Sequence, residues 1–295
     1  MNKGIIIKAI AGFYYVDSGD DVIECKARGK FRNKALSPLV GDRVEISVDN
    51  GKGAIENISK RKNHLIRPPI ANLDVLFIIA STANPAPNTF VIDKLTAYAE
   101  FVGVTPIIVT NKSDLASAQD LTEIYKNAGY KVIKASGLSG DGVDEIKSEI
   151  EGKICAFTGN SGVGKSSILN HIMPELSLQT ADISHKLGRG RHTTRHTELY
   201  RCGSGYIADT PGFSNFELQD ELFIHKDELQ DCFPEFEEFL GGCKFTSCAH
   251  IGEKGCAVVE AVNEGKIHKS RFENYVRMYK EAAEIPDWQL KKDRK

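Results

Sequence analysis

The chain has 295 residues, of which 41% are hydrophobic and 26% are charged, and its formal net charge is −2. These proportions are ordinary for a globular protein of two or three domains. No apolar run in the sequence reaches the length of a membrane span, which argues against a membrane-spanning protein. Seven cysteines in so long a chain argue against a secreted disulfide framework.

Residues 1–65 are predicted to form a small β-barrel. Turn residues separate its short apolar runs, which lie at 4–10, 13–16, 22–25 and 44–48. No helical pattern is convincing there, and five short strands of this length suit an oligonucleotide-binding (OB) barrel.

A basic repeat lies inside this segment, which carries 12 Lys/Arg against 8 Asp/Glu. Its members occupy every second position: Lys26, Arg28, Lys30, Arg32 and Lys34. An extended strand would place all five on one face, where they would suit an RNA phosphate backbone. A solvated strand or loop without a partner is the alternative.

An α/β domain is predicted to follow a linker at 64–69, where two prolines disfavour helix and central strand. Apolar runs typical of buried strands alternate there with helical patterns. The predicted strands lie at 73–80, 104–109, 130–134, 154–158 and 205–209, and the helical patterns at 90–101 and 121–128. This alternation predicts a mostly parallel sheet covered by helices, with ligands at the carboxyl ends of the strands.

The strand at 104–109 leads into Asn111, Lys112, Ser113 and Asp114, which read NKSD. The Asp114 carboxylate can accept hydrogen bonds from the N1–H and the exocyclic amine of guanine, and adenine offers neither donor in that place. A plain turn is the alternative for four residues taken alone. Ser136, in the turn after the strand at 130–134, is predicted to support the base.

The strand at 154–158 leads into GNSGVGKSS, which matches the phosphate-loop pattern G-x-x-x-x-G-K-[ST]. Backbone N–H groups of such a loop converge on phosphate oxygens at the start of the next helix. Lys165 would reach the β- and γ-phosphates, and the Ser166 hydroxyl would bind Mg²⁺. The predicted nucleotide-binding residues of the loop are Gly159, Asn160, Ser161, Gly162, Val163, Gly164, Lys165, Ser166 and Ser167.

Two further segments are predicted to respond to the γ-phosphate. A glycine-rich, basic stretch at 186–195 contains Thr193 and Thr194, and one of these two hydroxyls would complete the coordination of Mg²⁺. A surface loop without a role is the alternative. The strand at 205–209 ends in DTPG, whose Asp209 would hold Mg²⁺ through water and whose Gly212 N–H would contact the γ-phosphate.

The order of these motifs indicates a circular permutation. Ordinary GTPases place the phosphate loop before the NKxD motif, whereas here NKSD at 111–114 precedes the loop at 159–166 and DTPG at 209–212. An α/β domain tolerates such a rearrangement when its original termini lie close together.

A metal site is predicted near the C terminus. Three thiolates and one imidazole are the set that closes a tetrahedral structural Zn²⁺ site, and they come from Cys243, Cys248, His250 and Cys256. The other four cysteines are predicted to be core residues. A helix with a mostly apolar stripe follows at about 267–279, and the basic tail at 291–295 is either solvated or in contact with RNA.

With these motifs, the chain resembles the ribosome small-subunit-dependent GTPase A family. The resemblance implies an OB-like β-barrel that binds RNA (1–65), a circularly permuted α/β P-loop GTPase domain (66–217) and a mainly α zinc-binding domain (218–295). It also implies hydrolysis of GTP to GDP and phosphate in late maturation of the small (30S) ribosomal subunit, with activity stimulated by that subunit and with binding to rRNA. The implied cofactors are GTP/GDP, Mg²⁺ and one structural Zn²⁺.

Two positions qualify this resemblance. The family motif G-R-H-T-T-T has Arg195 in place of its third Thr, and Phe213 stands where small GTPases carry a water-positioning Gln. We expect His192 to position the water instead. The alternative function is an RNA-binding assembly factor that uses GTP only as a timing ligand. We expect a cytoplasmic monomer with no membrane partner and no signal peptide, because the N-terminal apolar stretch is short and lacks a cleavage site.

Overall fold

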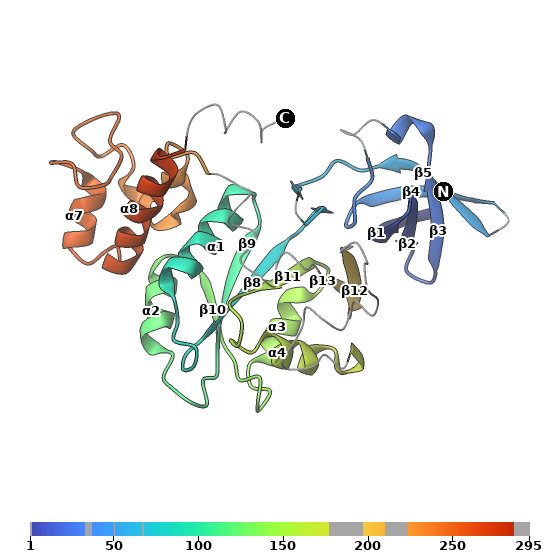
Figure 1. The fold of residues 1–295 in the computed structure, drawn as a ribbon, viewed down its shortest axis with the longest axis horizontal. Coiled ribbons are helices and arrows are strands. Elements are labelled where there is room, and N and C mark those ends of the chain that lie inside the picture. Colours follow the sequence, from blue (N-terminus) through green and yellow to red (C-terminus); the bar gives the residue numbers. More distant parts are fainter. Residues whose placement is uncertain are drawn as a thin grey trace.

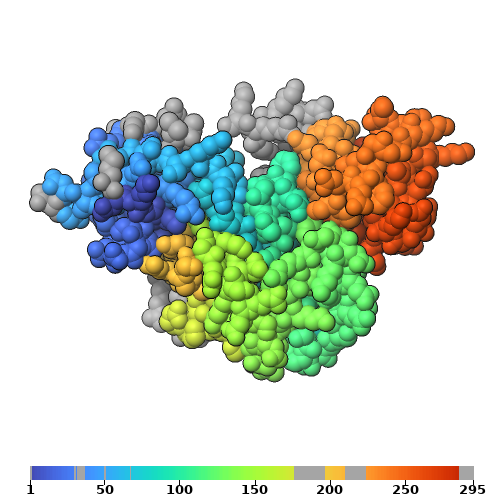
Figure 2. Space-filling model, turned by 180° about the vertical axis from the view of Figure 1, so that it is seen from behind, coloured from blue at the N-terminus to red at the C-terminus, as the bar shows by residue number. Residues whose placement is uncertain are grey.

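The computed structural model describes residues 2–32, 37–49, 51–66, 68–176, 197–209 and 224–285. The chain forms a β-barrel, an α/β domain and a small C-terminal domain. Figures 1 and 2 show the barrel and the C-terminal domain at opposite ends of the molecule, with the α/β domain between them. None of the described helices combines the length and the apolar character needed to cross a membrane.

The N-terminal barrel is closed by pairing between its first and fourth strands, with the order β1-β2-β3-β5-β4. Apolar side chains such as Ile6, Val16 and Ile55 are fully buried inside it. The strands are β1 Asn2–Ile10, β2 Phe13–Asp17, β3 Val22–Ala27, β4 Arg43–Asp49 and β5 Lys52–Ile58. The prediction of an OB-like barrel is confirmed.

The prediction that the basic repeat shares one strand face is wrong. β3 ends at Ala27, and Gly29–Arg32 forms a 3₁₀ turn that buries the Phe31 ring in the core. Gly29 weakens the strand at this point, and burial of the Phe31 ring stabilises the 3₁₀ turn. The alternation of side chains between two faces therefore does not continue beyond β3. Lys26 lies over the ring of Phe13 at 4.9 Å. Lys34 falls outside the described residues.

The predicted linker contains a short hairpin made of β6 His64–Leu65 and β7 Ile70–Ala71. Leu65 and Ile70 are buried in the same core as the barrel residues. The two prolines sit between the two strands, where no ladder hydrogen bond is required of them. This segment therefore connects the barrel to the α/β domain as packed structure.

The α/β domain has a parallel sheet in the order β10-β9-β8-β11-β13, with antiparallel β12 added at one edge. All residues of β8 and β11 are buried, because helices cover both faces of the sheet. The strands are β8 Val75–Ser81, β9 Thr105–Asn111, β10 Lys131–Lys134, β11 Ile154–Thr158, β12 Glu198–Cys202 and β13 Gly205–Asp209. The helices are α1 Thr89–Phe101, α2 Gln119–Asn127, α3 Val143–Ile150 and α4 Lys165–Ile172, with a 3₁₀ turn at Pro174–Leu176.

The C-terminal domain packs against α1 of the α/β domain. Its core contains Phe233, Phe236 and Tyr275, whose rings meet at centroid distances of 4.9 to 5.2 Å. Its helices are α7 Ala257–Asn263 and α8 Lys269–Ala283, preceded by 3₁₀ turns at Leu229–Cys232 and Pro234–Phe239. In Figure 1, α8 lies beside α1.

Candidate functional site

The predicted nucleotide motifs meet at one edge of the parallel sheet. Register pairs Thr158 of β11 with Ile78 of β8, and Ala156 of β11 with Ala208 of β13. β9 and β10 end at the same edge, where Asn111 closes β9. The carboxyl ends of adjacent parallel strands are the usual ligand site of this architecture.

The phosphate loop adopts a conformation that only glycine tolerates at two of its positions. Gly159 and Gly164 have φ values of 141° and 94°. A Cβ on Gly164 would come within 2.2 Å of the Asn111 amide nitrogen, and one on Gly159 within 2.3 Å of the Ile79 carbonyl oxygen. The glycine spacing therefore follows from close approach to β8 and β9 as well as from the turn itself.

Lys165, at the start of α4, is folded back into the loop. Its ammonium donates hydrogen bonds to the carbonyl oxygens of Gly159, at 2.5 Å, and Asn160, at 3.0 Å. Burial lowers the pKa of Lys165 to about 8. An anion in this loop would supply the negative partner that a buried ammonium needs. Ser166 follows in the first turn of the helix and is also buried.

Asn111 joins the two halves of the predicted site. Its side-chain amide donates to the carbonyl oxygen of Val163 at 2.7 Å, and its oxygen accepts from the Gly137 N–H at 2.8 Å. Lys112, in the left-handed region at φ 64°, donates to the carbonyl oxygen of Gly162 at 2.8 Å. The NKSD residues thus fix the phosphate loop relative to the turn at Ser136.

Asp114 lies at the surface, where a ligand can reach it. The fully buried Ser136 donates its hydroxyl to one carboxylate oxygen of Asp114 at 2.7 Å. Ser113 donates its hydroxyl to the carbonyl oxygen of Ala135 at 3.0 Å, which fixes the NKSD turn relative to the turn at Ser136. This arrangement orients the Asp114 carboxylate for donors on a ligand.

Asp209 closes β13 beside the phosphate loop. Burial, and secondarily the carboxylate of its cross-strand neighbour Glu198, raises the pKa of Asp209 to about 6. A divalent cation nearby would reverse that effect. The other predicted residues of the switch segments, His192, Thr193, Thr194 and Gly212, lie outside the described residues, as does Phe213.

The predicted metal ligands converge in the C-terminal domain. Cys243 Sγ lies 3.5 Å from His250 Nδ1 and 3.9 Å from Cys256 Sγ, and all four ligand atoms, including Cys248 Sγ, lie within 4.8 Å of one another. In a tetrahedral site with Zn–S distances of about 2.3 Å, two sulfur ligands lie nearly as far apart as Cys243 Sγ and Cys256 Sγ do here. The geometry and the donor set therefore fit Zn²⁺.

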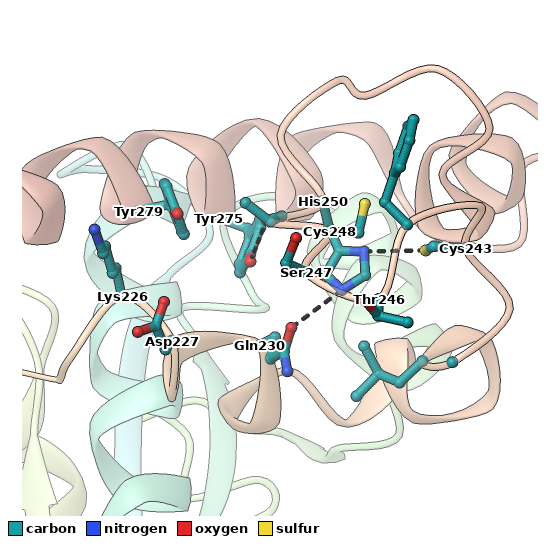
Figure 3. Close-up of a pocket in the computed structure, with 14 residues that line it drawn as sticks. Lys226, Asp227, Gln230, Cys243, Thr246, Ser247, Cys248, His250, Tyr275 and Tyr279 are labelled. Atoms are coloured by element: carbon teal, nitrogen blue, oxygen red, sulfur yellow. Dashed lines mark hydrogen bonds between the residues drawn. The ribbon is translucent and has the colours of Figure 1, made fainter.

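The surroundings of His250 favour metal binding through Nδ1. Figure 3 shows Gln230 facing the far side of the ring, where Nε2 lies 3.1 Å from Gln230 Oε1. An N–H on Nε2 fixes the tautomer and leaves the Nδ1 lone pair for the metal. Burial also lowers the pKa of His250, which favours the neutral ligand form.

Comparisons with known proteins identify the family. The model of the RsgA GTPase matches residues 58–219, and the model of the RsgA N-terminal domain matches residues 3–55. The chain belongs to the RsgA GTPase family. The predicted family resemblance is therefore confirmed, and the chain is a GTP-hydrolysing enzyme by family.

Relatives and solved structures agree with RsgA membership. The small ribosomal subunit biogenesis GTPase RsgA of Geobacillus sp. (strain WCH70) is 47% identical over 291 residues, covering 96% of this chain and 98% of the relative. Its counterpart in Clostridium perfringens (strain 13 / Type A) is 43% identical over 282 residues, covering 95% and 97%. The crystal structure of YjeQ from Thermotoga maritima is 37% identical, has a TM-score of 0.82 and covers 97% of this chain and 99% of its own.

The circular permutation has a counterpart among solved structures. The structure described as YloQ, a circularly permuted GTPase, is 37% identical, has a TM-score of 0.79 and covers 100% of this chain and 96% of its own. The permuted α/β fold predicted from motif order is therefore confirmed for this RsgA-family chain.

Two residues that belong to no motif lie beside the candidate sites and were not predicted from the sequence. Gln230 lies 3.1 Å from His250 but precedes the metal cluster outside any ligand spacing. Glu198 influences Asp209 only through the pairing of β12 with β13. Residue spacing along the chain predicts neither contact, because Gln230 and Glu198 reach their partners only through the fold.

Proposed function

We propose that this chain hydrolyses GTP to GDP and phosphate during maturation of the small ribosomal subunit, and that binding to this subunit and its rRNA stimulates the reaction. The observation that supports nucleotide binding is the side chain of Asn111, which bonds to both Val163 of the phosphate loop and Gly137 of the turn at Ser136. The subunit is proposed because the curated relatives are named small ribosomal subunit biogenesis GTPases.

In this proposal the guanine base binds to Asp114, beside Ser136, and the phosphates bind to the backbone N–H groups of residues 159–167. The ammonium of Lys165 exchanges its two carbonyl partners for the β- and γ-phosphates. A bound Mg²⁺ would neutralise phosphate charge, with the Ser166 hydroxyl as a direct ligand and Asp209 as a ligand through water. One threonine, Thr193 or Thr194, would complete its coordination.

Hydrolysis also requires that a water molecule be held in line with the γ-phosphate. Phe213 cannot do this, because its side chain offers no hydrogen-bonding group. We assign that role to His192. Docking on the subunit would fix His192 and the switch threonine over the nucleotide, so that binding energy lowers the barrier.

Turnover measured with and without purified small subunits tests this proposal. We expect slow intrinsic hydrolysis that rises at least ~10-fold with small subunits, and we expect His192→Ala to abolish the rise while GTP affinity and subunit binding stay near wild type. Large subunits serve as the control. Negligible turnover under all conditions would favour the timing-ligand alternative, and a stimulated His192→Ala variant would move the role to another group.

We also propose that the cluster of Cys243, Cys248, His250 and Cys256 holds one structural Zn²⁺. Four protein ligands close the coordination shell, so the metal would stabilise the C-terminal domain rather than activate water.

Cys248→Ala is expected to lose one equivalent of zinc and to unfold the C-terminal domain, with GTP affinity within about 3-fold of wild type because the phosphate loop lies elsewhere. Metal analysis, circular dichroism and nucleotide titration would measure this. Cys232→Ala is the matched control, since Cys232 is a buried cysteine of the same domain outside the cluster. Unchanged zinc content in Cys248→Ala would contradict the assignment.

A further inference from the structure

The hairpin formed by β12 and β13 connects the two segments that are proposed to sense the γ-phosphate. Its five register pairs run from Glu198↔Asp209 at the open end to Cys202↔Gly205 at the turn. The stretch with Thr193 and Thr194 precedes β12 along the chain, and Asp209 begins the DTPG motif. A shift of this hairpin would therefore act on both segments, because it is joined to each of them along the chain.

The same hairpin is attached to the barrel at its open end. β12 pairs with β1 at Lys8↔Glu198, which makes the barrel and the α/β sheet one continuous sheet. The Lys8 ammonium lies 2.9 Å from the Glu198 carboxylate, and both side chains are about one-third exposed. Figure 1 shows β12 on the side of the α/β domain that faces the barrel.

The closed end of the hairpin is attached to the barrel as well. Tyr206 donates its hydroxyl to the buried Asp17 carboxylate at 2.9 Å, and Arg201 donates to the carbonyl oxygen of Gly19 at 2.8 Å. Between the two ends, Leu199 shares one apolar core with the barrel residues Ile6 and Val16. Because polar bonds at both ends flank a shared core, the barrel and the hairpin are packed together as one unit.

We infer that Lys8 and Asp17 of the barrel are positioning residues for hydrolysis. They act through their partners in the hairpin, Glu198 and Tyr206, so that binding of the ribosomal subunit at the barrel affects the nucleotide site. This inference rests on the proposed function. The physical basis is differential contact: a partner that binds one orientation of the barrel more tightly also favours one position of the hairpin. Lys8 and Asp17 belong to none of the predicted nucleotide-binding or metal-binding motifs, so basal chemistry is left to those motifs.

Charge reversal across the Lys8–Glu198 pair tests the inference. At saturating small subunits, Lys8→Glu is expected to reduce stimulated turnover at least about 5-fold, the lower range of energetic coupling between sites, with intrinsic turnover and GTP affinity within about 2-fold of wild type. The double variant Lys8→Glu/Glu198→Lys restores the attraction and is expected to recover most of the stimulation, expressed as the ratio of stimulated to intrinsic turnover of the same variant, because Glu198 also pairs with Asp209 across the hairpin. Lys3→Glu, the same charge change on β1 opposite Glu45 of the barrel, is the matched control and is expected to stay near wild type.

Tyr206→Phe gives a second measure that keeps the ring and removes only the hydrogen bond to Asp17, and it is expected to lower stimulation about 3-fold. Subunit affinity and thermal unfolding are recorded for each variant, so that weaker binding or misfolding is separated from uncoupling. Full stimulation in both Lys8→Glu and Tyr206→Phe would overturn the inference, as would a loss that the double reversal fails to restore. A wild-type chain that small subunits do not stimulate would instead overturn the proposed function, and the inference with it.

Discussion

Asp114→Asn is expected to weaken GTP binding at least ~100-fold and to improve binding of xanthosine triphosphate, because a site built for particular donors rejects a mismatched base strongly. The Ser136 hydroxyl donates to one oxygen of Asp114, so the asparagine oxygen will take that place. The asparagine NH₂ then faces the base, where it meets the amine of guanine unfavourably and the extra carbonyl of xanthine favourably.

Titration of the variant with both nucleotides, followed by turnover of each, would measure this switch. Asp120→Asn is the matched control, because Asp120 is an exposed acidic residue nearby, in the first turn of α2. A variant that keeps the wild-type preference for GTP would show that Asp114 does not read the base.

Arg271→Met is expected to destabilise the protein by about 3–5 kcal/mol, because it leaves two buried carboxylates without their cationic partner. Arg271 is 1% exposed and donates to Glu235 at 2.7 and 3.0 Å and to Asp93 of α1 at 2.8 Å. Asp93 is itself fully buried, and Asn274 donates to its second oxygen at 2.6 Å. Burial alone would lower the pKa of Arg271, but Asp93 and Glu235 outweigh it and keep the guanidinium charged.

Denaturant unfolding followed by circular dichroism would measure the loss, with Lys280→Met, an exposed change on the same helix, expected within about 1 kcal/mol of wild type. The triple variant Arg271→Met/Asp93→Asn/Glu235→Gln removes all three charges and is expected to regain part of the loss. Stability equal to wild type in Arg271→Met would mean that this ion pair does not hold the C-terminal domain to α1.

Much of the fold follows from local sequence patterns. Continuous apolar runs predicted β8 and β11, since a strand covered on both faces needs no polar alternation. The regular spacing of Val143, Ile146 and Ile150 marks α3 as well, although this helix was not among the predicted ones. The basic repeat failed as a strand because burial of Phe31 in a 3₁₀ turn overrides a period of two.

The sequence by itself determined the motifs, their permuted order and the four candidate metal ligands, because each depends on residue type and spacing along the chain. Only the tertiary structure decided that Asn111 ties the turn at 136–137 to the phosphate loop. It also decided that Arg271 reaches Asp93 across 178 positions, and that Lys8 meets Glu198 across 190. Partners so distant are brought together by the packing of separate elements. Hydrogen bonds and ion pairs depend on distance in space, and local periodicity carries no information about them.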